Sequence, residues 1–273
     1  MLASGLEIHS NLTMNWSPDP ILIELGPLAI RWYSLMFLGA FFLGFHIMVY
    51  VFKQENKPVE DVDYVLTSMF VGTLIGARLG HCLFYEPAYY LSNPIEILKV
   101  WKGGLASHGA AIGIFTAIYF YSKKRPDQPY LWILSRLSLA VSFAGILIRV
   151  GNFFNSEIIG NPTDLPWAII FSNVDDLPRH PSQLYESLCY AITFFFLLYV
   201  YKKSAAQISP AKFFGLFLTL LFSSRFLVEF SKTPQAAFAA SLPVSMGQIL
   251  SIPFILFGLY LLCKTEDSSG KPD

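Results

Sequence analysis

The chain has 273 residues, of which 54% are hydrophobic, 16% are aromatic and only 14% are charged, and its formal net charge is zero. A soluble globular domain carries about 25% charged residues, so this composition indicates an integral membrane protein. The balanced charge argues against a nucleic-acid partner, and three cysteines in apolar runs offer neither a disulfide framework nor the spacing of a metal site.

The hydropathy pattern along the chain predicts seven membrane-spanning helices. The first twenty residues lack the cationic start and apolar core of a cleavable signal peptide. Beyond them, seven stretches approach the roughly 20 mostly apolar residues that a helix needs to cross a bilayer. They cover residues 29–51, 63–85, 104–121, 131–154, 182–201, 213–230 and 247–263. We therefore expect an all-α polytopic membrane protein that forms a single domain over residues 1–273.

Two of these stretches carry regularly spaced glycines. Gly72, Gly76 and Gly80 recur at every fourth position of the second stretch, and Gly109 and Gly113 lie in the third. Small residues at this spacing let helix backbones approach closely. The third stretch is the weakest of the seven because it is short and rich in small residues, and we expect its glycines to serve helix packing.

Basic residues in the loops set the expected orientation. Cytoplasmic loops carry an excess of Lys and Arg. With the N-terminus outside, ten basic residues lie on the inner side and four on the outer side. The ten are Lys53, Lys57, Lys123, Lys124, Arg125, Lys202, Lys203, Lys212, Lys264 and Lys271, and the four are Lys99, Lys102, Arg179 and Lys232. We therefore place the N-terminus outside and the C-terminus in the cytoplasm.

The longest outer connection covers residues 155–181. Its Gly, Pro, Asn and Asp residues mark turns, and its segment PWAIIF (166–171) is a candidate short strand. We expect this loop to form a small cap over the outer ends of the helices.

Several polar residues fall within or beside the apolar stretches, where an unpaired charge costs at least about 2.5–3.5 kcal/mol at the bilayer centre. Arg31 and Arg136 lie near the ends of their stretches, so we expect their side chains to reach the interface. With the expected orientation, the others gather toward the outer side. They are Tyr33, Arg78, His108, Arg149, His180, Gln183, Tyr185 and Arg225. Independent structural ion pairs would have no reason to share one side, so this grouping predicts a site in the outer leaflet.

Two arginines suggest what this site binds. Arg149 and Asn152 are three residues apart and Arg225 and Glu229 are four apart, so each pair can touch on a helix. The planar fork of arginine matches phosphate oxygens bidentately. Two arginines that converge from separate helices at headgroup depth therefore suggest a phospholipid headgroup site. The alternative is a polar network that only fixes helix packing.

His108 lies among glycine and alanine residues in GGLASHGAAIGI (103–114). These small neighbours leave room for a ligand beside its ring, and histidine is suited to proton transfer near neutral pH. It is either a general base or a hydrogen-bonded structural residue.

Seven segments, in chain order, resemble the motifs of the prolipoprotein diacylglyceryl transferase family. They are RWYSLMF (31–37), GARLG (76–80), GGLASHGAAIGI (103–114), RVGNFFNSEIIG (149–160), RHPSQLYE (179–186), RFLVEF (225–230) and GQILSIP (247–253). The resemblance extends over nearly the whole chain, from about residue 20 to residue 263. Ala110, Ser135 and Ile148 depart from the glycine, aspartate and glycine that family members often carry there, which affects the role of that aspartate and the packing around His108.

The resemblance implies an enzyme of the bacterial inner membrane, with a periplasmic N-terminus and a site toward the periplasmic leaflet. Its implied reaction transfers the diacylglyceryl group of phosphatidylglycerol to the lipobox cysteine thiol in a prolipoprotein signal peptide and releases glycerol phosphate. No cofactor or metal is implied, and its partners would be these two substrates and membrane lipids. By position, Arg149 would bind the lipid phosphate, Arg225 would be the second essential arginine and His108 the base. Tyr33, Asn152, Glu157 and Glu229 match positions associated with activity or substrate binding.

Two other classes of function stay open on the residues alone. A polytopic transporter could use the same charges, but it would spread polar groups through the full depth of the membrane, whereas the inner half offers little beyond Arg136. A lipid-binding or scaffolding protein would share the charges without performing chemistry.

Overall fold

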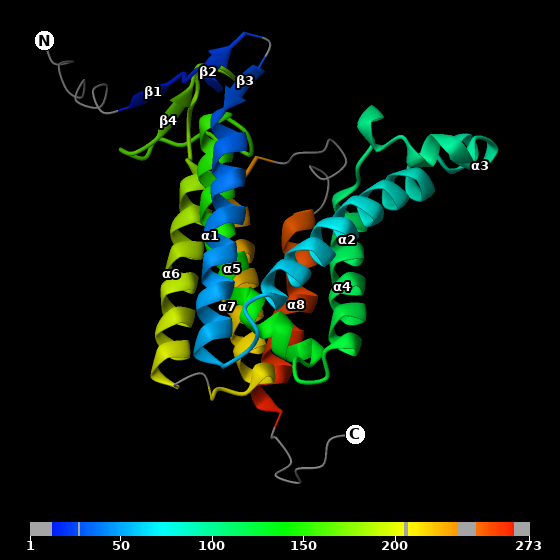
Figure 1. The fold of residues 1–273 in the computed structure, drawn as a ribbon. Coiled ribbons are helices and arrows are strands. Elements are labelled where there is room, and N and C mark those ends of the chain that lie inside the picture. The colour runs from blue at the N-terminus through cyan, green and yellow to red at the C-terminus, as the bar shows by residue number, and fades with distance from the viewer. Residues whose placement is uncertain (1–12, 27, 205–206, 234–243, 265–273) are drawn as a thin grey trace, which may run out of the picture. The chain divides into compact units, whose positions relative to one another are not determined.

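The computed structural model describes residues 13–26, 28–204, 207–233 and 244–264, and it is mostly helical (Figure 1). The predictions that rest on Lys271 and on the first twelve residues lie outside these ranges. Contacts divide the chain into two compact units. The first holds the chain up to Gly44 and from Ser138 onward, and the second is Phe45–Leu137. A single domain over residues 1–273 stays a prediction.

In the described part of the chain, seven long helices follow the seven predicted stretches. They are α1 (Trp32–Gln54), α2 (Asp61–Phe84), α4 (Ser107–Lys124), α5 (Tyr130–Phe154), α6 (Ser182–Lys203), α7 (Pro210–Val228) and α8 (Met246–Cys263). All except α4, six helices in these ranges, are long and apolar enough to cross a membrane. The protein is therefore polytopic, and a seventh crossing stays a prediction.

The helix ends differ from the predicted ones by up to three residues. The first helix begins at Trp32 rather than residue 29, because residues 29–31 belong to a strand. The third begins at Ser107 rather than 104, after Gly103 and Gly104, whose φ angles of 84° and 70° are incompatible with a right-handed helix. Apolar composition locates a helix, but the turn residues beside it decide where it ends.

The first unit contains β-structure that we did not predict near the N-terminus. The strands β2 (Ile21–Leu25) and β3 (Leu28–Arg31) form an antiparallel hairpin. A second sheet has the order β1-β4-β5, in which β1 (Met14–Trp16) runs parallel to β4 (Ile169–Phe171), and β4 runs antiparallel to β5 (Pro178–Arg179). The strand predicted within PWAIIF is confirmed as β4.

This second sheet is attached to the last turn of α5. The indole Nε1 of Trp16 donates to the carbonyl of Phe153 at 3.0 Å, and the two rings stack with centroids 4.4 Å apart. Phe153, Ile169 and Phe171 form a buried cluster. The loop that follows α5 is thereby held against the end of that helix.

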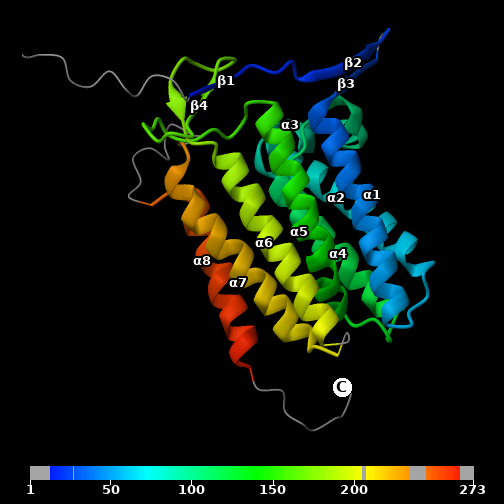
Figure 2. The same cartoon turned by 90° about the vertical axis from the view of Figure 1, so that its left-hand side faces the viewer.

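Three further helices of the first unit lie side by side, α6 against α7 and α7 against α8 (Figure 2). α7 and α8 meet through small residues. A Cβ added at Gly215 would lie 2.7 Å from the carbonyl oxygen of Gly258, and one at Gly258 would lie 2.6 Å from Thr219 Oγ1. This close approach lies in the first half of α7 and near the end of α8.

In the second unit, α2 and α4 cross (Figure 1) at the glycines singled out in the sequence. A Cβ added at Gly76 would lie 2.2 Å from the carbonyl oxygen of Gly109, and one at Gly113 would lie 2.0 Å from that of Gly72. Any side chain here would collide with backbone, so the predicted packing role is confirmed.

The connection between α2 and α4 contains α3 (Pro87–Ser92), η1 (Pro94–Leu98) and η2 (Val100–Lys102). Buried Arg78 holds it by donating to the carbonyls of Ile97 at 2.9 Å and Gly103 at 2.6 Å. The guanidinium group of Arg78 therefore donates to backbone carbonyls and stabilises the fold of this connection.

Arg136 does not reach the interface as predicted. It is 2% exposed, and its Nε lies 2.6 Å from Glu55 Oε1. A long side chain reaches toward water only where no closer carboxylate pairs with it, and spacing along one helix could not reveal a partner on another.

Candidate functional site

The first unit concentrates charged side chains at one end of α5, α6 and α7, and two of them, Glu186 and Lys232, are buried. Three cations and three carboxylates lie there, and ion pairs link four of them, from Arg149 of α5 through Glu186 and Lys232 to Glu229 of η3 (Glu229–Ser231). The cations are Arg149, Arg225 and Lys232, and the carboxylates are Glu157, Glu186 and Glu229.

The last turn of α5 and the residues after it form the first part of the site. Arg149 Nη1 donates to Asn152 Oδ1 at 3.3 Å, which confirms that these two residues share a helix face. Asn152 Nδ2 donates in turn to Glu157 Oε2 at 3.0 Å. Glu157 reaches back to the helix because the chain reverses at Ser156, whose φ is 54°, and because Gln183 Nε2 donates to the Glu157 carbonyl at 2.6 Å.

Glu186 on α6 is the centre of the charge cluster, and the sequence reasoning missed it. Its side chain is fully buried, with Oε2 2.9 Å from Arg149 Nε and Oε1 2.9 Å from Lys232 Nζ. Lys232 Nζ also lies 3.0 Å from Glu229 Oε2. The sequence does carry a signal for Glu186, since a glutamate inside an apolar helix is as unusual as an arginine, whereas Lys232 reads as an ordinary loop charge.

The predicted contact between Arg225 and Glu229 is wrong. Among the described residues no side-chain hydrogen bond or ion pair joins them, and the backbone N–H of Glu229 donates to the Arg225 carbonyl, whereas the Glu229 carboxylate pairs with Lys232. The carboxyl group of Glu229 also lies against Gly247, where an added Cβ would be 2.4 Å from Glu229 Cδ. Arg225 Nε is buried without a hydrogen-bond partner in this part of the chain.

Arg225 and Arg149 share one neighbour on α6 within electrostatic range. Both guanidinium groups are close enough to the hydroxyl of Tyr190 on α6 to act on it electrostatically. That the two arginines converge on one headgroup stays a prediction.

Five buried polar atoms in this region have no hydrogen-bond partner among the described residues. They are Asn155 Oδ1, Ser156 Oγ, Gln183 Oε1, Glu186 Oε2 and Arg225 Nε. Of these, Glu186 Oε2 still lies in an ion pair with Arg149 at 2.9 Å. Leaving such a group unsatisfied costs about 1–3 kcal/mol, and proteins rarely tolerate it without a functional reason. Their concentration around two arginines is typical of a site that receives a polar ligand.

The remaining predicted residues occupy different places. Tyr33, on the first turn of α1, packs on α5 at Gly151, where an added Cβ would lie 3.0 Å from Tyr33 Cδ2. It therefore lies at the helix turn between Arg149 and Asn152. His108 belongs to the second compact unit, on the first turn of α4, and is exposed. Its assignment as the base stays a prediction.

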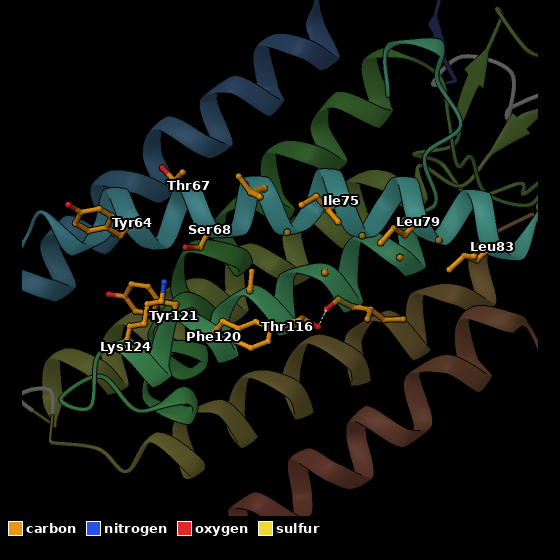
Figure 3. Close-up of a pocket in the computed structure, with 18 of the residues that line it drawn as sticks. Tyr64, Thr67, Ser68, Ile75, Leu79, Leu83, Thr116, Phe120, Tyr121 and Lys124 are labelled. Carbon is orange, nitrogen blue, oxygen red and sulfur yellow. Dashed lines mark hydrogen bonds between the residues drawn. The ribbon is translucent and has the colours of Figure 1, made fainter. Parts of the chain in front are cut away.

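The second unit also contains a pocket of about 840 Å³ along the crossing of α2 and α4. Figure 3 shows Ile75, Leu79 and Leu83 of α2 across from Thr116 and Phe120 of α4. The lining is mainly apolar, and a pocket of this size and character accommodates hydrocarbon chains better than charged headgroups.

Comparisons with a family model and with individual proteins agree with one another. A family model described as prolipoprotein diacylglyceryl transferase matches residues 20–264. The chain is 52% identical to a protein of Chloroherpeton thalassium and 49% identical to one of Tolumonas auensis, each over 247 residues. The alignments cover 90% of this chain and 92% and 95% of those proteins. A protein of Porphyromonas gingivalis is 41% identical over 266 residues, covering 92% of this chain and 94% of its own. All three are named phosphatidylglycerol–prolipoprotein diacylglyceryl transferase.

Proposed function

Because the chain belongs to the prolipoprotein diacylglyceryl transferase family, we propose that it transfers the diacylglyceryl group of phosphatidylglycerol to a cysteine thiol of a prolipoprotein. The thiol acceptor is the lipobox cysteine of the signal peptide, and the second product is glycerol phosphate. The transporter alternative has no support from the relatives, whose names all describe this transfer.

We also propose where the reaction takes place. The protein lies in the bacterial inner membrane, with α4 as a seventh crossing, the N-terminus in the periplasm and the C-terminus in the cytoplasm. The bias of basic residues between the two sets of loops supports this orientation. The loop 155–181 is then periplasmic, and the charge cluster beside it faces the periplasmic leaflet.

One observation carries the proposal, namely a cluster of ion pairs around Arg149 and Glu186 with unfilled buried donors and acceptors, Arg225 Nε among them. A phosphodiester supplies acceptors for guanidinium donors, and Arg225 Nε has none among the described residues. Arginine binds phosphate bidentately and stays charged when buried. The lipid phosphate therefore fits between Arg149 and Arg225.

The reaction exchanges one bond to carbon for another. The cysteine sulfur attacks the diacylglycerol carbon that carries the phosphate ester, a C–S bond forms, and the C–O bond breaks. Its electron pair leaves on the glycerol phosphate. Arg149 and Arg225 stabilise this growing negative charge, and one preorganised donor of this kind contributes about 3 kcal/mol.

The attacking thiol must lose its proton. A free cysteine has a pKa of about 8.5, so only a small fraction is thiolate at neutral pH. His108 is the proposed acceptor of this proton, as the family resemblance implies. Asn152 orients Arg149, Glu157 holds Asn152, and Glu229 holds Lys232.

The test is a transfer assay with purified protein, phosphatidylglycerol and a lipobox peptide, read by mass spectrometry. We expect the peptide to gain one diacylglyceryl group, and Arg149→Gln to abolish the gain. Lys202→Gln, which removes an exposed charge outside the site, is the control and should retain activity. A transporter or a scaffold would leave the peptide unmodified. If His108→Gln keeps near-full activity, the base assignment fails while the arginine assignment stands.

A further inference from the structure

We propose that Glu186 occupies Arg149 while the lipid site is empty, and that the phosphate of the incoming lipid displaces it from Arg149 while Lys232 retains it. The inference rests on the proposed function and deepens it, because it gives Glu186 and Lys232 positioning roles that the family resemblance did not suggest.

Glu186 lies between two cations from different parts of the chain. It is fully buried on α6, and its two oxygens face Arg149 of α5 and Lys232, which follows η3. A buried carboxylate is tolerated only when it is paired. Because either cation alone can neutralise it, Glu186 can give up one partner without becoming an isolated buried charge.

The two sides of this carboxylate are held differently. Oε1 accepts hydrogen bonds from Lys232 Nζ at 2.9 Å and from the Tyr190 hydroxyl at 3.4 Å. Oε2 lies 2.9 Å from Arg149 Nε, yet it has no aligned hydrogen-bond donor among the described residues. Lys232 is further fixed by Glu229. Glu186 thus makes an aligned hydrogen bond to Lys232, whereas its equally short ion pair with Arg149 lacks one, which makes the Arg149 contact the easier one to exchange.

Of the two cations that contact Glu186, the more exposed one is also the one whose contact is easier to exchange. The side chain of Arg149 is 13% exposed, against 7% for Lys232. An anion that enters the site therefore reaches Arg149 more easily, where it can replace the carboxylate with a bidentate phosphate contact.

The net charge of the cluster indicates how the exchange affects lipid binding and product release. The three cations and three carboxylates of the cluster sum to zero, so a phosphodiester adds one uncompensated negative charge. While Glu186 lies on Arg149, it competes with the phosphate for the same guanidinium. After C–O cleavage, the return of Glu186 to Arg149 would help to expel glycerol phosphate. Glu186 thus weakens headgroup binding and speeds product release.

The experiment measures binding of a fluorescent phosphatidylglycerol to the full-length protein in phosphatidylcholine nanodiscs. Because Glu186→Gln removes the competing charge and keeps the side-chain shape, the apparent Kd should fall by about tenfold or more, as expected for close buried charge pairs. Inhibition by glycerol phosphate should strengthen, and kcat should fall while KM falls with it. Lys232→Met should instead raise the apparent Kd, because Glu186 then has Arg149 as its only cation.

The outcomes separate a positioning role from a structural one. If Glu186 only stabilises packing, Glu186→Gln will lower the melting temperature and weaken binding, which overturns the proposal. Unchanged or weaker binding in a fully folded Glu186→Gln protein overturns it as well. If that variant does not fold, Lys232→Met decides, and tighter or unchanged binding there refutes the exchange.

The inference and the proposed function can fail separately. If the unmodified protein transfers no lipid but Glu186→Gln still tightens phosphatidylglycerol binding, the function is wrong and the exchange stands. If transfer occurs and neither variant changes affinity in the stated direction, the exchange alone is wrong.

Discussion

Replacing Gly76 with alanine should push α2 and α4 apart, because the added methyl group would meet backbone atoms of α4 that cannot rotate away. The new Cβ would lie 2.2 Å from the carbonyl oxygen of Gly109 and 2.8 Å from Gly113 Cα, whereas ordinary contacts begin at 3.4 Å. The helices must therefore separate locally by about 1 Å.

The energetic cost follows from this overlap. Overpacking of this kind costs about 1–3 kcal/mol, and the better helix propensity of alanine returns up to about 1 kcal/mol. We expect a net loss of about 1–2 kcal/mol. At about 2–4 °C for each kcal/mol in a chain of roughly this size, the melting temperature should fall by several degrees.

The assay is thermal unfolding of the purified protein in detergent, with Gly44→Ala as the matched control. A Cβ at Gly44 on α1 would meet Ala140 Cβ at 3.7 Å, an ordinary contact, so this variant should melt at or slightly above the temperature of the parent. The reasoning is refuted if Gly76→Ala melts as high as Gly44→Ala.

The same substitution tests the role of α4 in catalysis. His108 immediately precedes Gly109, so a displacement of Gly109 also moves His108. A misplacement of about 1 Å can lower a rate on the order of 10²-fold. If His108 is the base, transfer activity of the folded Gly76→Ala protein should fall much more than its stability does. Activity equal to that of Gly44→Ala would show that the position of this helix turn does not matter for the reaction.

Three further predictions follow from individual contacts. Arg149→Lys keeps the charge but loses the planar fork, so kcat/KM for transfer should fall about 10²–10³-fold; a fall below about threefold in steady-state kinetics would contradict bidentate phosphate binding. The ammonium group of Lys102 is the main cause that lowers the pKa of Glu96 to about 2 from its usual 4.5. A lowered pKa stabilises the folded chain above pH 4.5, and this contribution is lost as the pH falls through 2. In thermal unfolding, the parent protein should therefore be more stable than Glu96→Gln at pH 6, and most of this difference should have gone by pH 2. Asp61 is buried and accepts two hydrogen bonds from Arg125 Nε and Nη2 at 3.0 and 2.7 Å. Asp61→Asn should therefore destabilise the protein by about 2–3 kcal/mol, measured by denaturation in detergent. An unchanged denaturation midpoint would mean that water replaces this pair.

Structural features that are set by residues close together along the chain could be predicted from the sequence. The seven helices follow from runs of apolar residues, the contact of Arg149 with Asn152 follows from a spacing of three, and the packing role of the glycines in α2 and α4 follows from their spacing of four. Helix geometry makes each of these a local property, because the positions of residues one turn apart are set by the backbone alone. The family resemblance was readable for the same reason, since its motifs are short contiguous segments.

What only the tertiary structure decided was which partner each buried charge chose. Spacing allowed Arg225 to touch Glu229, yet Glu229 pairs with Lys232, and Lys232 with Glu186, which is 46 residues away. Likewise, β1 pairs with a strand more than 150 residues later. A charged side chain buried in a helical protein takes the nearest opposite charge in space. That neighbour is set by how distant helices pack, which no spacing along the chain records.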